Sequence, residues 1–153
     1  MTLPSRSRQS CSGRILAIDP GERRIGVAAA DPRTRVAIPL TTIEAGADPV
    51  EAVARLAEEE GAEAIVVGLA LSLSGALGPQ AQRAQSLADA LAQRLGIPVH
   101  TWDERLTSSE AQRRLPRDRR SPRGKRRRGD VDALAAAIIL QAFLDSQRRP
   151  ASG

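Results

Sequence analysis

The feature that most constrains the fold is an apolar run ending in a single carboxylate, residues 15–19, which is followed at once by Pro20 and Gly21. Four apolar residues in succession predict a strand buried within a sheet, and a Pro-Gly pair predicts a turn. The next apolar run, residues 25–30, then predicts a strand that returns alongside the first. Such a hairpin places Asp19 at its open end, where a carboxylate either caps the turn or belongs to a functional site.

Length and composition limit the classes of protein to which the chain can belong. Its 153 residues are enough for one domain with one core. Trp102 and Phe143 are the only aromatic residues, so the core must be aliphatic, and stacking of nucleic-acid bases on aromatic side chains is not expected. Cys11 is the single cysteine, which excludes an internal disulfide and favours a reducing compartment. No apolar stretch approaches the roughly 18 residues of a membrane helix, so we expect a cytoplasmic protein without a membrane partner.

Positive charge is concentrated in one segment. The whole chain has a formal charge of +5, and residues 113–128 contain ten basic side chains and one acidic side chain. That segment therefore carries +9 and the rest of the chain −4. A basic segment on an acidic body predicts a polyanionic partner that is bound through its phosphates. Residues 117–129 are too charged and too rich in Pro and Gly to fold alone, so we expect a mobile basic loop there.

Strands and helices alternate along the remainder of the chain. A third strand, residues 36–40, is expected at a sheet edge because Pro39 cannot donate to a central ladder. Apolar periodicity and capping residues predict the other elements. In chain order these are a helix between Asp48 and Gly61, a strand 64–68, a helix 79–95, a strand 97–102, a short helix 107–115 and a last helix of about 130–145. The pattern indicates one α/β domain over residues 14–145, between flexible tails at 1–13 and 146–153.

Acidic residues recur at strand ends and helix starts. Asp19 follows the first strand, Asp103 and Glu104 follow the fifth, and Asp132 lies in the first turn of the last helix. Sites in α/β sheets form outside the carboxyl ends of parallel strands, so these acids can converge. Converging carboxylates repel one another unless a cation lies between them, which is how Mg²⁺ and Mn²⁺ sites arise. Each acid alone also has a structural interpretation, such as a favourable position at a helix start or a surface ion pair with Arg105.

A carboxylate cluster with a bound divalent cation predicts hydrolysis of phosphodiester bonds. The cation would polarise the phosphate, activate a water and neutralise the leaving oxygen, while basic side chains would hold the nucleic-acid backbone. His100, the only histidine, is expected to be an ordinary strand residue. The side chains predicted to contact nucleic acid are Arg23, Arg24, Arg105, Arg123, Lys125, Arg126, Arg127 and Arg128.

Four blocks of the sequence resemble the YqgF-type (RuvX-like) family of pre-16S rRNA nucleases and Holliday junction resolvase-like proteins, within the RNase H-like superfamily. They occur in the order of that family and span most of the chain. The last two are specific in combination, whereas an isolated D-x-G is not. The blocks are ILAIDPGERRIGVA (15–28), IVVGL (65–69), DERLT (103–107) and VDALAA (131–136).

The resemblance implies an RNase H-like fold with a mixed five-stranded sheet and a role in trimming the 5′ end of pre-16S rRNA in the bacterial cytoplasm. It also implies Mg²⁺ or Mn²⁺ as cofactor. The catalytic and metal-holding acids would be Asp19, Glu104 (or its neighbour Asp103) and Asp132. In the loop 70–77 this chain lacks two acids and an amide that are usual in the family, so its activity and substrate preference stay open.

Three other interpretations of the sequence differ in substrate or activity. A Holliday junction resolvase would act on branched DNA as a homodimer, and sequence separates neither this substrate from RNA nor a monomer from a homodimer. A sugar-kinase or actin-like ATPase is disfavoured because that fold needs two such domains and this chain has room for one. A non-catalytic RNA-binding assembly factor would keep the acids without turnover.

Overall fold

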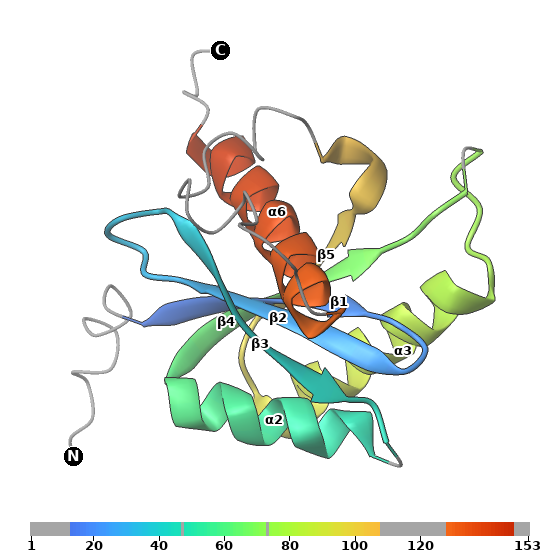
Figure 1. The fold of residues 1–153 in the computed structure, drawn as a ribbon, viewed down its shortest axis with the longest axis horizontal. Helices are drawn as coiled ribbons and strands as arrows, with labels where there is room; N and C mark the ends of the chain where they lie inside the picture. Colours follow the sequence, from blue (N-terminus) through green and yellow to red (C-terminus); the bar gives the residue numbers. More distant parts are fainter. Residues whose placement is uncertain (1–12, 47, 73, 108–127, 149–153) are drawn as a thin grey trace.

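Five strands form a single mixed sheet in the computed structural model, which describes residues 13–46, 48–72, 74–107 and 128–148 (Figure 1). The strand order is β3-β2-β1-β4-β5. The first three strands form an antiparallel meander, and the last two add in parallel to β1. Their bounds are β1 (Arg14–Pro20), β2 (Arg24–Ala30), β3 (Ala37–Glu44), β4 (Ala62–Leu69) and β5 (Val99–Asp103). The predicted mixed sheet is confirmed, and the strand with Pro39 lies at its edge.

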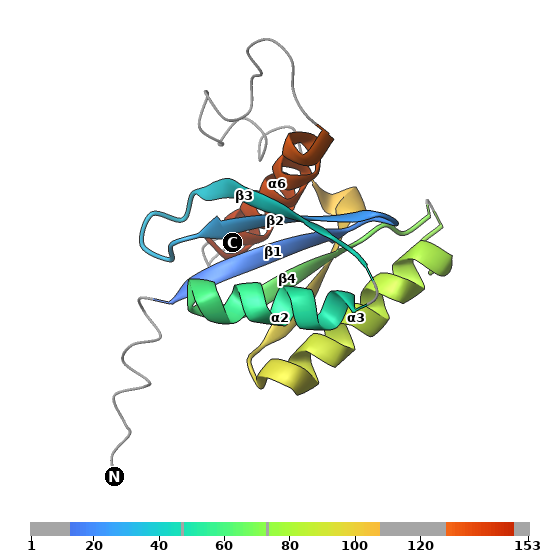
Figure 2. The same cartoon turned by 60° about the horizontal axis from the view of Figure 1, so that its bottom comes forward.

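Helices cover both faces of the sheet. Helices α2 (Pro49–Glu60) and α3 (Pro79–Leu95) pack on one face and α6 (Arg128–Arg148) crosses the other (Figure 2). The short 3-10 helix η2 (Glu104–Leu106) follows β5. The start of α2 is as predicted, since the Asp48 carboxylate accepts a hydrogen bond from the Glu51 amide over 3.1 Å. Among the described residues no helix is both long and apolar enough to cross a membrane.

Several predicted boundaries were wrong. Strand β3 continues to Glu44 because its pairing with β2 extends as far as Arg24. The last helix is longer than predicted at both ends, and residues 146–148 of the predicted tail are helical. Within this last turn the Ser146 hydroxyl donates to the Phe143 carbonyl over 2.7 Å. Residues 128 and 129, assigned to the basic loop, already belong to α6. Residues 108–115 of the predicted short helix, residues 117–127 of the predicted loop, and residues 1–12 and 149–153 of the predicted tails lie outside the described part of the chain.

The core is aliphatic and alanine-rich, as predicted. Alternate residues of β1 point to opposite faces: Leu16 and Ile18 pack with α2 and α3, whereas Ala17 packs under α6. The sheet presents small residues to α6, so that this helix can lie close to the strands. The buried strand side chains beneath it include Ala17, Ala28, Ala30 and Val66, which form one cluster with Ala136, Leu140 and Phe143 of the helix.

A buried glutamine fixes α6 to the turn between β2 and β3. The Gln141 Oε1 accepts from the Ala37 amide over 2.9 Å, and its Nε2 donates to the Arg35 carbonyl over 3.1 Å. Arg35 has a left-handed φ of 55°, and its guanidinium donates to the Leu144 carbonyl over 2.9 Å. These bonds set the register of α6 on the sheet, and they thereby determine where its first turns, with Asp132, come to lie.

Candidate active site

Three carboxylates converge at one edge of the sheet. Asp19 lies near the end of β1, Glu104 begins η2 directly after β5, and Asp132 lies about one turn into α6. Because β1 and β5 both run parallel to β4, their carboxyl ends share an edge. Asp19 forms a side-chain hydrogen bond with Glu104 and interacts electrostatically with Asp132. The structure thus brings together the three acids that the sequence singled out.

The surroundings of Asp19 raise the pKa of its carboxyl to about 7. Burial is the largest cause, because it disfavours the charged form, and the nearby Glu104 and Asp132 add repulsion. A hydrogen bond between two carboxyl groups also requires that one of them carry a proton. In the absence of a cation, therefore, Asp19 keeps its proton to a pH well above the ordinary range of an aspartic acid.

Glu104, and not Asp103, is the acid beside Asp19. The Asp103 carboxylate caps η2 by accepting from the Arg105 amide over 2.9 Å, and it pairs with the Arg105 guanidinium at 2.6 Å. These contacts lower the pKa of Asp103. The guanidinium also donates to the Ser72 carbonyl over 3.3 Å and so links the end of β5 to the loop that follows β4. The predicted surface ion pair exists at Asp103, whereas Glu104 points into the cluster.

The basic residues of the first hairpin lie next to the cluster. Arg24 Nε lies 3.3 Å from Asp132 Oδ2, and these side chains are 23% and 36% exposed. The ion pair offsets part of the negative charge of the cluster and orients Asp132. Arg23 is exposed at the tip of the hairpin. Among the other predicted nucleic-acid contacts, residues 123–127 and the side chain of Arg128 lie outside the described part of the structure.

His100 occupies an ordinary strand position, as predicted. It is exposed on β5, and its ring centroid lies 5.3 Å from that of Phe143.

The acids fit a divalent cation by their chemistry. Carboxylate oxygens are the ligands that Mg²⁺ and Mn²⁺ prefer, and a cation could replace the proton that Asp19 retains beside Glu104. Within the described residues, no three acidic, histidine or cysteine side chains already surround one point at ligand distances. The third carboxylate, Asp132, faces Arg24, so the three acids would have to draw together when an ion binds.

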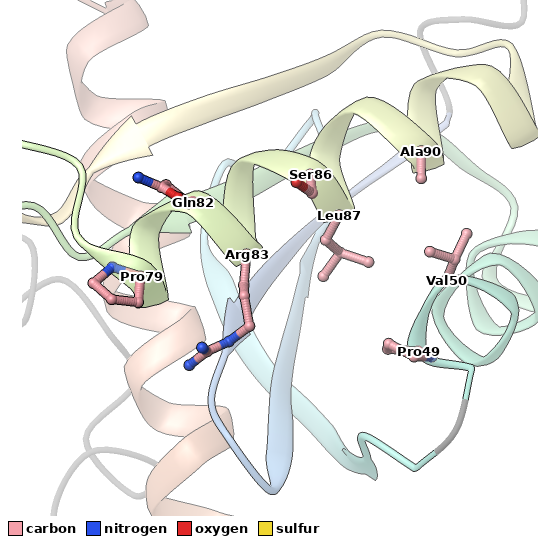
Figure 3. A pocket seen from close by; sticks show the side chains of 8 residues that line it. All are labelled: Pro49, Val50, Pro79, Gln82, Arg83, Ser86, Leu87 and Ala90. Atoms are coloured by element: carbon pink, nitrogen blue, oxygen red, sulfur yellow. The ribbon is translucent and has the colours of Figure 1, made fainter.

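A groove of about 670 Å³ lies between α2 and α3, on the other face of the sheet from α6 (Figure 3). Its lining is mostly apolar, and Arg83 is the only charged side chain among the described residues that line it. Since none of these lining residues is a carboxylate, the groove is a poor candidate for the metal site. Its lining residues are Pro49, Val50, Pro79, Gln82, Arg83, Ser86, Leu87 and Ala90.

Comparison with known proteins identifies the family. The family model described as "RuvX: Holliday junction resolvase" matches residues 13–146. The chain belongs to the RuvX family. Relatives named "Putative pre-16S rRNA nuclease" include one from Chloroflexus aurantiacus (strain J-10-fl), 47% identical over 137 residues that cover 88% of each chain. Another, from Thermobifida fusca (strain YX), is 43% identical over 144 residues that cover 90% of this chain and 91% of the relative.

Solved structures show the same fold as this RuvX-family chain at low sequence identity. RuvC of T. thermophilus in complex with a Holliday junction substrate matches 88% of this chain and 95% of its own, with a TM-score of 0.60 and 18% identity. Fowlpox virus resolvase with Holliday junction DNA matches 89% and 99%, with a TM-score of 0.57 and 8% identity. The predicted family and RNase H-like fold are confirmed. As a RuvX-family protein, the chain is a nuclease, and dependence on divalent metal is general for its fold.

We expect the metal-free protein to lose stability as the pH rises from about 4 to 7. The pKa of Asp19 is 3.8 in a model peptide and about 7 in the folded chain. Between these values the folded state binds more protons than the unfolded state, so the free energy of unfolding falls as the pH rises. The expected loss is roughly 2–4 kcal/mol. Urea unfolding in EDTA across this range, for wild type and Asp19→Asn, isolates the contribution of Asp19 as the difference between the curves. If the free energies of unfolding of wild type and Asp19→Asn changed with pH in parallel, Asp19 would titrate in the ordinary range of an aspartic acid.

Proposed function

We propose that the protein hydrolyses phosphodiester bonds near the 5′ end of pre-16S rRNA, with Mg²⁺ or Mn²⁺ held by Asp19, Glu104 and Asp132. The observation that carries this proposal is the half-buried Asp19 carboxyl facing two further carboxylates at one edge of an RNase H-like sheet. Nearly full-length relatives at 43% and 47% identity bear the name of a pre-16S rRNA nuclease, which favours this RNA over DNA. A ribosomal precursor as substrate implies a cytoplasmic enzyme.

The acidic and basic residues of the site have separate roles in the proposed mechanism. When bound, a divalent cation supplies positive charge to the scissile phosphate and lowers the pKa of the attacking water. Asp19 gives up its proton and offers carboxylate oxygens from a partly buried position, where electrostatic interactions are stronger than in water. Glu104 supplies a second carboxylate, and Arg24 orients Asp132 until the substrate arrives. Arg23, exposed beside the cluster, is placed to contact a backbone phosphate.

The test of substrate compares a labelled 5′ leader of precursor 16S rRNA with a four-way DNA junction, each incubated with Mn²⁺, with Mg²⁺ or with EDTA. We expect metal-dependent cutting of the RNA and little cutting of the junction. Cleavage of the junction with the RNA left intact would contradict the proposal. Binding of both without cleavage would favour a non-catalytic assembly factor.

Junction resolution is the second candidate, because the matching family description and both solved structures name Holliday junctions. A resolvase needs two sites that face paired strands, and hence a dimer. Light scattering of the purified protein measures its oligomeric state and therefore distinguishes the two candidate functions. A monomer that cuts the RNA would leave no role for paired sites.

A further inference from the structure

Two glycines flank Asp19 at the same level of the sheet. On β2, Gly26 is the register partner of Asp19. On β4, Gly68 lies one residue beyond Val67, which pairs with Ile18. Side chains alternate between the faces of a sheet, and Ala17, Ala28 and Val66, each two residues away, pack under α6. Gly26, Asp19 and Gly68 therefore form a row that faces α6.

The position of a side chain at Gly68 is taken by the Glu104 carboxylate. A Cβ atom built on Gly68 would lie 2.9 Å from Glu104 Oε2 and 2.7 Å from Ile139 Cδ1. Both neighbours are the far ends of flexible side chains, so an added methyl group can be accommodated only if these groups move. Glu104 thus reaches Asp19 across the surface of a residue that has no side chain.

The corresponding space at Gly26 is taken by the backbone of α6. A Cβ atom built on Gly26 would overlap the carbonyl group of Asp132. The start of α6 can therefore lie directly on β2, with Asp132 beside the register partner of Gly26, which is Asp19. A backbone carbonyl cannot move aside independently of its helix, so this contact fixes the helix itself.

We propose that Gly26 and Gly68 are positioning residues of the active site, which leave free the space that Asp132 and Glu104 need to reach Asp19. Gly68 sets the position of a carboxylate, and Gly26 sets the position of the helix that carries the other. This inference rests on the proposed function, because it takes the three carboxylates to be the ligands of the cation.

The test uses Gly68→Ala, because its contacts are with flexible groups and the protein should still fold. The matched control is Gly78→Ala, since a Cβ atom there meets nothing within 4 Å. The readouts are the dissociation constant for Mn²⁺, from electron paramagnetic resonance of the free ion, the free energy of unfolding, and kcat and KM for RNA cleavage. We expect Gly68→Ala to bind Mn²⁺ roughly 10–100-fold more weakly, as is typical when groups that orient metal ligands are changed. Its kcat should fall with KM nearly unchanged, and the control should resemble wild type.

A second variant separates the two contacts of Gly68. Gly68→Ala combined with Ile139→Val removes the Cδ1 atom that the new methyl group meets. We expect the double variant to regain any free energy of unfolding that Gly68→Ala loses. Its affinity for Mn²⁺ should stay low, because Glu104 remains displaced. Recovery of affinity, or an unchanged dissociation constant in Gly68→Ala, would overturn the inference while leaving the proposed function intact. A wild-type protein that binds no Mn²⁺ would instead overturn the proposed function and this inference together.

Discussion

Replacing Asp19 with Asn is expected to lower the rate of RNA cleavage by about 10³-fold or more, with the fold and the affinity for RNA retained. An amide has nearly the shape of a carboxyl but cannot give negative charge to a cation. A bound metal contributes several kcal/mol to transition-state stabilisation, and ~4 kcal/mol corresponds to about 10³-fold in rate. Because Asp19 is half-buried among like charges, the neutral amide should not lower the free energy of unfolding.

Single-turnover cleavage with saturating enzyme measures this effect, with circular dichroism and filter binding as checks on fold and affinity. The matched control is Asp103→Asn, because Asp103 adjoins Glu104 in sequence but pairs with Arg105 outside the cluster. We expect the control to keep most of the activity. Wild-type rates in Asp19→Asn would refute the mechanism, and a loss in Asp103→Asn as large as that in Asp19→Asn would refute the choice of Glu104 over its neighbour.

Turn and cap residues made much of this site predictable. Pro20 and Gly21 mark where the first strand ends, and the sequence places acids at the ends of the first and fifth strands. Their convergence could therefore be inferred before any contact was known. The choice between Asp103 and Glu104 could not be inferred. It depends on the 3-10 turn after β5, in which Asp103 becomes the cap and its successor points to Asp19.

Contacts between segments that lie far apart in the sequence could not be predicted from the sequence. Arg24 and Asp132 are 108 residues apart, and their ion pair exists only because α6 crosses the sheet above β2. The roles of Gly26 and Gly68 likewise depend on what packs over them. One signal was present in the sequence, since a glycine inside an otherwise apolar strand often marks the close approach of another group.

Neutralising residues 117–128 of the basic segment is expected to weaken RNA binding by roughly 10²-fold at moderate salt and to flatten its salt dependence. The change replaces the eight basic residues of 117–128 with Gln. Each phosphate contact to a single strand contributes about −0.7 to the slope of log affinity against log salt. If half of the eight contact phosphates, the slope should become shallower by about 3. The measurement is RNA affinity across about 50–200 mM KCl.

The control for this prediction uses cations at the far edge of the sheet. Arg14 begins β1 and Arg33 lies in the turn after β2, and both form ion pairs, with Glu60 and Asp31. Replacing these two with Gln changes the net charge but removes no cation near the acids, so the salt slope should stay that of wild type. If the salt slope fell by the same amount per removed charge in both variants, the effect would come from net charge in general and not from contacts made by 117–128. An unchanged slope after neutralisation of 117–128 would show that the contacts with phosphates are made elsewhere in the chain, for example by Arg23, which is exposed in the first hairpin.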